Sequence, residues 1–297
     1  MNIMKIRNPR AGEISDLQSI WVSVFGSIGL DVFFRLLYDP ELCVVAEVEG
    51  SPAAMGFIIP SGEVVFADEN RNDTDPVKCA MIYSVATIPK FRGMGLGTSV
   101  VNGLIDIAFK HDFTAVVLCP SDDGLFCYYS ERTGLRDRFF VKEKTFRREN
   151  IGNATDIPVK LSAYEYYLIR EKLLKNITHI KQDLYAIEYQ SLLCSELGGG
   201  LYRIGDSCAV VERQSDHLVW IKELLAPGVI EKNLADDTAI SDVVASLAVE
   251  FHADEYLVRS PAETGEGRRF GMIMLSESSF FERKSTFFEP WYGVAFD

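Results

Sequence analysis

Apolar residues recur every three to four positions in several parts of the chain, and this interval predicts helices with one buried face. The stretches with helical spacing are 12–26, 29–40, 95–112, 123–134, 163–177, 181–197 and 239–253. Runs rich in β-branched residues predict strands between these helices. The predicted strands are 42–50, 51–66, 79–89, 113–120, 135–148, three within 201–225, then 254–261 and 291–297. This order predicts an α/β fold with helices on both faces of a mixed sheet.

The segment 149–162 has the polar, Gly- and Pro-containing composition of a linker. We therefore predict a first domain over 1–148 and a second α/β domain over 163–297. Residues 100–120 and 243–261 share a helix, a His/Asp pair and an apolar strand that ends in proline. Either the second domain is a degenerate copy of the first, or the likeness is the common pattern of any helix–strand unit.

Composition narrows the class of protein. The chain is 47% hydrophobic and 25% charged, as in a folded globular protein, and no run of eighteen apolar residues predicts a membrane span. The first residues lack the apolar stretch of a secretory signal. Six scattered cysteines without a Cys-x-x-Cys pair, together with isolated histidines, favour a reduced cytoplasmic protein without a metal site. A net charge of −13 argues against nucleic-acid binding and is compatible with a cationic substrate.

The stretch "YSVATIPKFRGMGLGTSVV" (83–101) joins a predicted strand to a predicted helix through a glycine-rich turn. A dinucleotide-binding turn would need a third glycine where Thr98 stands, and a carboxylate at the end of the next strand. A phosphate-binding loop of the ATPase type would need a lysine, which this turn lacks. A third interpretation includes Arg92 and places a pyrophosphate against the backbone N–H groups at the start of the helix.

The pattern Arg92-x-x-Gly95-x-Gly97, after a strand and before a helix, resembles the acyl-CoA-binding turn of the GNAT N-acetyltransferase superfamily. This resemblance implies a GNAT-like fold, with a mixed, mostly antiparallel sheet and flanking helices, and acetyl-CoA as the acyl donor. It also implies that Val85, Ala86 and Thr87 bind the pantetheine arm, and that an N–H group around Ala86 polarises the acetyl carbonyl. The residues whose N–H groups would hold the pyrophosphate are Arg92, Gly93, Met94, Gly95, Leu96, Gly97 and Thr98.

The helix "DGLFCYYSERTGL" resembles the superfamily segment whose tyrosine protonates the leaving thiolate. The resemblance implies Tyr129 as this general acid, with Tyr128 as the alternative. Gly134 stands five residues after Tyr129, where four is usual in the family, and a leucine replaces the usual aromatic residue. This departure leaves the choice of tyrosine open.

The general base has two candidates. An acidic loop holds Asp68, Glu69, Asp73 and Asp75. The chain also resembles two-domain enzymes similar to the enhanced-intracellular-survival (Eis) acetyltransferases, which use a C-terminal carboxylate, and this chain ends at Asp297. In the second domain "LAPGVIEKNLADDTAIS" stands in place of the glycine turn, which predicts that this domain has no CoA site of its own.

The resemblance thus predicts an acetyl-CoA-dependent N-acetyltransferase that acts by direct attack of an amine in a ternary complex. Its acceptor is a small-molecule or peptide amine that the sequence does not identify, and a monomer and a homodimer remain open. The main alternative is a binding protein that holds acyl-CoA without turnover, as a sensor or scaffold. A dinucleotide-dependent oxidoreductase is the third alternative, and it would require NAD binding instead of CoA binding.

Overall fold

The computed structural model describes residues 4–67, 76–227, 237–276 and 289–296. The chain forms two compact units, and each unit combines segments that lie far apart in the sequence. The N-terminal unit comprises residues 1–64, 75–137 and 271–283. The C-terminal unit comprises residues 65–74, 138–270 and 284–297.

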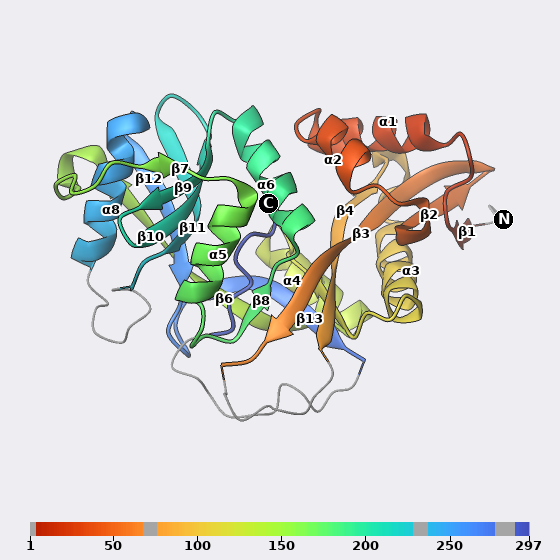
Figure 1. Cartoon of the computed structure of the whole chain (residues 1–297). Coiled ribbons are helices and arrows are strands. Elements are labelled where there is room, and N and C mark those ends of the chain that lie inside the picture. Colours follow the sequence, from red (N-terminus) through yellow and green to blue (C-terminus); the bar gives the residue numbers. More distant parts are fainter. Residues whose placement is uncertain (1–3, 68–75, 228–236, 277–288, 297) are drawn as a thin grey trace. The chain divides into compact units, whose positions relative to one another are not determined.

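The sheet of the N-terminal unit has the strand order β1-β2-β3-β4-β5-β13 (Figure 1). Neighbouring strands are antiparallel except β4 and β5, which are parallel and are connected through a helix. The strands are β1 (Met4–Arg7), β2 (Cys43–Val48), β3 (Ser51–Val65), β4 (Val77–Thr87), β5 (Ala115–Leu118) and β13 (Arg268–Leu275).

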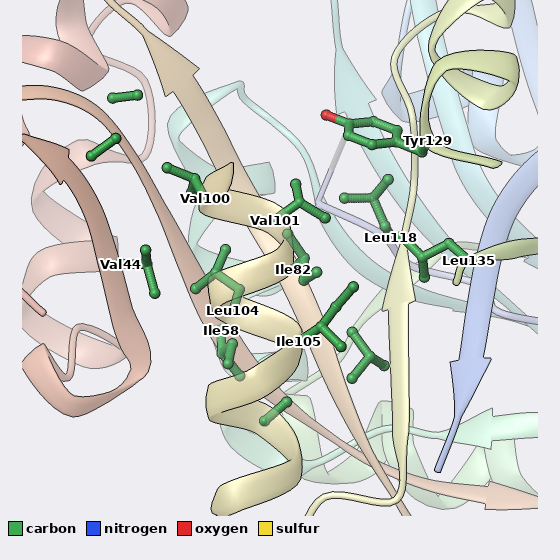
Figure 2. Packing of buried hydrophobic residues seen from close by; sticks show 14 of the residues in the cluster. Val44, Ile58, Ile82, Val100, Val101, Leu104, Ile105, Leu118, Tyr129 and Leu135 are labelled. Atoms are coloured by element: carbon green, nitrogen blue, oxygen red, sulfur yellow. The ribbon is translucent and has the colours of Figure 1, made fainter. Parts of the chain in front are cut away.

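Helices cover both faces of this sheet because successive strand residues point to opposite sides. On one face, apolar residues of β2 to β5 pack against α3, and Figure 2 shows Val100, Val101, Leu104 and Ile105 of this helix in the cluster. On the other face, aromatic residues of α1 and α2 contact β3 and β4. The helices are α1 (Ile14–Phe25), α2 (Leu30–Leu36), α3 (Leu96–Lys110) and α4 (Asp123–Arg132), with short 3-10 turns at Pro40–Leu42 and Pro89–Phe91.

The sheet of the C-terminal unit has the order β7-β9-β10-β11-β12-β6, and only β11 and β12 are parallel. Ser162 and Glu165 form a capping box that begins α5 at the end of the predicted linker. The strands are β6 (Arg136–Arg147), β7 (Val159–Lys160), β8 (His179–Lys181), β9 (Gly200–Ile204), β10 (Ser207–Arg213), β11 (Leu218–Leu225) and β12 (Glu255–Pro261). The helices are α5 (Ala163–Leu173), α6 (Leu184–Glu196), α8 (Asp237–Glu250) and the 3-10 turn Arg148–Asn150.

The two sheets share one plan. Each has antiparallel strands, then a parallel pair connected by a helix, then one antiparallel strand at the end. The last strand of each unit comes from the sequence region of the other unit. Strand β6 follows α4 in sequence but pairs with β12, and β13 follows β12 in sequence but pairs with β5. The compact units therefore differ from the predicted ranges 1–148 and 163–297. The mixed, mostly antiparallel sheet with flanking helices is as the sequence predicts.

The chain end departs from the prediction. The sequence predicts a strand over 291–297, but the described part of this segment contains only an isolated bridge between Trp291 and His179. The reason is local, because Gly293 and Phe296 have φ values of +80° and +58°, which no continuous strand adopts. The sequence pattern also does not predict β1, β7, β8 and β13.

Candidate functional site

The pairing between the parallel strands β4 and β5 stops part-way along β4, where β5 ends. Their paired residues run from Cys79 opposite Ala115 to Ile82 opposite Leu118, and β4 then continues to Thr87. From Tyr83 onward, the edge of β4 that faces away from β3 therefore lies beyond the last pair with β5. Such an opening between two parallel strands gives an extended ligand access to backbone groups.

A bulge in β4 marks the beginning of this opening. Ser84 has a φ of +48°, which is rare for a residue with a side chain. The register with β3 shifts at the same place, between Met55 and Phe57, so that Gly56 lies opposite the bulge. A Cβ at Gly56 would lie 2.8 Å from Leu104 Cδ1 and 2.9 Å from Val100 Cγ1, so a larger residue would force these packed side chains to move. Strained backbone of this kind is common at functional sites, and the sequence pattern does not indicate it.

The last residues of β4 direct alternate backbone groups to the open edge. Ile88 N donates to Ala53 O at 3.0 Å, and Ala86 is paired with Met55. Antiparallel alternation then turns the N–H of Ala86 toward β3 and the N–H and carbonyl of Thr87 away from it. Arg92 Nε donates to this Thr87 carbonyl at 3.3 Å. Of the residues expected to bind pantetheine, Thr87 thus faces the open edge more clearly than Ala86.

Two glycines of the turn adopt positive φ values, which residues with a side chain rarely adopt. Gly93 and Gly95 have φ values of +80° and +76°, a region that costs a residue with a Cβ about 1–2 kcal/mol. A Cβ at either position would meet nothing within 4 Å, so space is not the constraint. At Gly97 a Cβ would make an ordinary contact at 3.9 Å from Thr87 Oγ1. The two glycines before α3 are therefore the ones that shape the turn.

The start of α3 presents open hydrogen-bond donors. Gly95 is the N-cap and supplies no side-chain cap, and the first turn has no acidic residue. The first backbone bond of the helix runs from Ser99 N to Gly95 O, so the N–H groups of Leu96, Gly97 and Thr98 precede the helical ladder. The preceding residues 92–95 are exposed. Open N–H groups, the helix dipole and an accessible turn together form a site suited to an anion.

The two tyrosines of α4 have different surroundings. The Tyr128 hydroxyl forms a hydrogen bond with Thr98 Oγ1 in the first turn of α3. The Tyr129 ring is 8% exposed and belongs to the cluster under α3, and Figure 2 shows it beside Leu118. Burial raises the pKa of Tyr129 to about 12, and the neighbouring Tyr128 and Asp122 add to the shift. Tyr129 therefore stays protonated over the ordinary pH range, as a proton donor must.

An aromatic cluster lies on the opposite face of β4. The Tyr83 ring is 5.8 Å from Trp21 and 5.6 Å from Phe33, measured between ring centroids. Trp21 and Phe33 are buried, as core residues would be, whereas Phe25 is 45% exposed. Because Tyr83 directly precedes the bulge, these aromatic rings lie on the α1–α2 side of the strand that opens.

The C-terminal unit contains a buried polar network that the sequence pattern does not indicate. Glu223 accepts hydrogen bonds from the Tyr166 hydroxyl, from Arg170 Nε at 3.1 Å and from Trp291 Nε1 at 2.6 Å. Both Arg170 and Glu223 are fully buried. Although burial opposes it, the charges of Glu223 and Glu171 raise the pKa of Arg170, so this guanidinium stays charged.

This network fixes the end of the chain within its unit. Arg170 Nη2 donates to Tyr292 O at 3.4 Å, and a Cβ at Gly293 would lie 2.3 Å from Glu223 Oε1. Residues 291–296 are buried. Asp297, the predicted base, lies outside the described residues, and so do the acidic residues Asp68, Glu69, Asp73 and Asp75.

Among the described residues, no group of three or more His, Cys, Asp or Glu side chains is arranged to hold a metal ion. None of the described helices has the length and hydropathy needed to cross a membrane.

Comparison with protein families identifies the region that holds the site. Residues 14–126 match the model of the acetyltransferase (GNAT) family. The chain carries a GNAT domain. The match covers the bulged strand β4, the glycine turn, α3 and the beginning of α4, so the GNAT domain contains most of the predicted site. A search of curated protein sequences found no match.

Solved structures share the fold over nearly the whole chain. A GCN5-related N-acetyltransferase from Anabaena variabilis superposes with a TM-score of 0.65 and 15% identity, over 93% of this chain and 73% of that one. A GCN5-related N-acetyltransferase from Kribbella flavida gives 0.64 and 13%, over 92% and 71%. Eis1 from Mycobacterium abscessus gives 0.60 and 13%, over 91% and 73%. At these identities the similarity establishes the fold, which extends beyond the GNAT domain into the C-terminal half.

Proposed function

We propose that the protein is an acetyl-CoA-dependent N-acetyltransferase that transfers the acetyl group to a primary amine by direct attack in a ternary complex. The observation that carries the proposal is the combination, within the matched GNAT domain, of an opened β4 edge and an uncapped helix start behind the glycine turn. Solved structures with this fold include N-acetyltransferases by name. The open edge of β4 would match the thioester arm of an extended donor, and the uncapped start of α3 would match its diphosphate.

The donor fits the open backbone groups of this unit. Acetyl-CoA, when bound, supplies the acetyl group as a thioester. The open edge of Val85, Ala86 and Thr87 would hold the pantetheine arm, with Thr87 contributing both its N–H and its carbonyl. The residues from Arg92 to Thr98 would hold the pyrophosphate through backbone N–H groups and the helix dipole. An N–H group on the open edge near Ala86 would polarise the acetyl carbonyl, an interaction typically worth about 3 kcal/mol of barrier.

Tyr129 would hold the proton that the departing thiolate needs. Its raised pKa keeps the hydroxyl protonated, and its burial in the cluster under α3 restricts the ring to one orientation. The acceptor amine must also lose a proton. For this step we propose the side-chain carboxylate of Asp297, with the acidic residues of 68–75 as the alternative source.

The proposed base can be tested by substituting this one residue. D297N removes the negative charge of the side chain and keeps its size, and D297A removes the carboxylate altogether. If the proposal holds, both variants lose kcat at saturating acetyl-CoA and keep their affinity for CoA. Unchanged turnover in both variants would exclude Asp297 and leave the acidic segment as the candidate.

We further propose that the C-terminal unit is a degenerate GNAT-like copy without a CoA site. Its parallel pair ends at Ile221 opposite Val258, and Arg259 is the next residue of β12. The Arg259 guanidinium lies 4.9 Å from the Trp220 ring and 4.3 Å from the Phe270 ring, and its Nε donates to Glu143 at 2.9 Å. A buried, ion-paired arginine thus follows the end of this parallel pair, which supports the proposal that no pantetheine arm binds there.

The acceptor is proposed as a small-molecule or peptide amine, with a cationic compound favoured by the net charge of −13. All six cysteines are free thiols, which supports a reducing compartment such as the cytoplasm.

Binding and turnover measurements would test the activity separately. In a thermal-shift assay, we expect CoA and acetyl-CoA to raise the melting temperature and NAD to leave it unchanged. A CoA-release assay over polyamines, aminoglycosides, amino acids and peptides should then give amine-dependent release for at least one class. Binding of acetyl-CoA without release for any amine would favour the acyl-CoA sensor instead. Stabilisation by NAD alone would contradict the proposal as a whole.

A further inference from the structure

Tyr128 and Tyr129 are adjacent on α4, so their side chains leave the helix about 100° apart and reach different surroundings. The Tyr128 hydroxyl is bonded to Thr98 Oγ1, and the Arg132 guanidinium lies 4.5 Å from the centroid of the Tyr128 ring. The Tyr129 ring is packed in the core 5.3 Å from that of Tyr128. Tyr128 thus has a hydrogen-bond partner at the start of α3, whereas Tyr129 is packed in the core.

Thr98 occupies a sensitive position. It is the third residue of α3, and its N–H is among the donors that precede the helical ladder. Its side chain therefore belongs to the same first turn as the backbone donors that we propose for the pyrophosphate. The side chain is half-buried, so it is partly held by its neighbours and partly accessible.

The direction of the hydroxyl–hydroxyl bond follows from the chemistry of its partners. A phenol is a stronger hydrogen-bond donor than an aliphatic alcohol, and its oxygen is a weaker acceptor. Tyr128 is therefore the donor and Thr98 Oγ1 the acceptor. A threonine hydroxyl has one proton and two lone pairs, so accepting from Tyr128 leaves the Thr98 proton available for another acceptor.

We propose that Tyr128 is a positioning residue that orients the Thr98 hydroxyl, so that this hydroxyl adds one side-chain donor to the backbone donors of the pyrophosphate site. The inference rests on the proposed use of CoA and extends it. It separates the two tyrosines: Tyr128 serves the diphosphate end of the donor, and Tyr129 serves the thioester end. It also predicts that loss of the Tyr128 hydroxyl weakens donor binding through Thr98 alone.

The test is a double-mutant cycle read by isothermal titration calorimetry on the full chain. The probes are CoA and 3′-dephospho-CoA, both of which contain the pyrophosphate. We expect T98V to weaken binding of both probes by about 10-fold, because a hydrogen bond to a charged group is lost. We expect Y128F to weaken binding about 3- to 10-fold, and the Y128F/T98V double variant to bind like T98V. T98S, which keeps a hydroxyl, should recover most of the affinity that T98V loses.

Three results would overturn the inference. Y128F could bind both probes like the wild type, or it could weaken binding by the same factor in the T98V background as in the wild type. In the third case, Y128F would abolish turnover without changing CoA affinity, which would make Tyr128 the proton donor. Thermal unfolding of each variant identifies any that fail to fold. In that case the comparison is between the CoA affinities of T98S and T98V. If the wild type bound neither probe, the proposed function itself would fail and the inference with it.

Discussion

The substitution G95A tests whether the glycine turn before α3 is a binding element. Gly95 has a φ of +76°, and a Cβ there would meet nothing within 4 Å. The substitution therefore introduces a conformational cost of about 1–2 kcal/mol and no steric clash. Because the turn is exposed and an added Cβ has no packing contacts there, we expect the alanine of G95A to relax into an ordinary conformation in the free protein.

The cost then appears as lost affinity. Binding must restore the positive φ, so the apparent dissociation constant for CoA rises by the factor that corresponds to 1–2 kcal/mol, about 5- to 30-fold. The melting temperature should change little, because the free protein no longer carries the strain. The assay is calorimetric titration with CoA, accompanied by a thermal unfolding curve for each variant.

A matched control separates this effect from a general loss of structure. Gly50 lies in the turn between β2 and β3, has a φ of +86° and would also accept a Cβ without contacts. G50A should therefore carry a similar conformational cost while leaving the affinity for CoA unchanged. The proposed role of the turn is refuted if G95A binds CoA as tightly as the wild type, or if G50A weakens binding as much as G95A does.

Four further predictions test other parts of the site and the fold. Y129F should lower kcat by about 100-fold with little change in CoA affinity, since it removes a general acid; a variant with full turnover would exclude this role. Because the Tyr129 pKa is raised to about 12, the wild-type rate should show no fall from its ionisation below about pH 11 in a pH–rate profile. E223Q should destabilise the protein by about 3 kcal/mol, or roughly 6–12 °C in melting temperature, because a buried guanidinium loses its main counter-charge; an unchanged melting curve would contradict this. Burial opposes ionisation of Glu143, but Arg268 and Arg259 outweigh it and lower the pKa of its carboxylate, so its stabilising effect is present above about pH 4.5 and is lost as the pH falls further. Denaturant titrations at several pH values should show this loss, and E143Q should reduce its size.

The helices and most strands of the chain follow from local patterns. Residues 96–110 form α3 as their spacing predicts, and the glycines before them mark the turn that shapes the site. The pairing of the strands was not predictable in the same way. Nothing in the apolar run of β13 indicates that it pairs with β5, about 150 residues earlier, because period-two patterns identify a buried strand and not its partner.

In the candidate site, too, some features have a local sequence motif and others depend on residues far apart in the sequence. The donor turn has a local motif, so its resemblance to the GNAT superfamily predicts Arg92 to Thr98 as donor-binding residues without any long-range information. The bulge at Ser84 depends on Gly56 of the neighbouring strand, and the network of Glu223 depends on groups from α5 and the chain end. A charged residue in an apolar run has no sequence signal for its distant partner. Long-range pairing of this kind becomes visible only in the folded structure.

The activity that we propose for the N-terminal unit is the transfer of an acetyl group from acetyl-CoA to an amine. The most direct measurement follows free CoA and acetylated amine together by mass spectrometry, in one reaction of the full chain with acetyl-CoA and the amine panel. We predict that the two products form in equal amounts, only when an amine is present, and far more slowly with Y129F. Tight binding of acetyl-CoA with no acetylated product from any amine would contradict the claim.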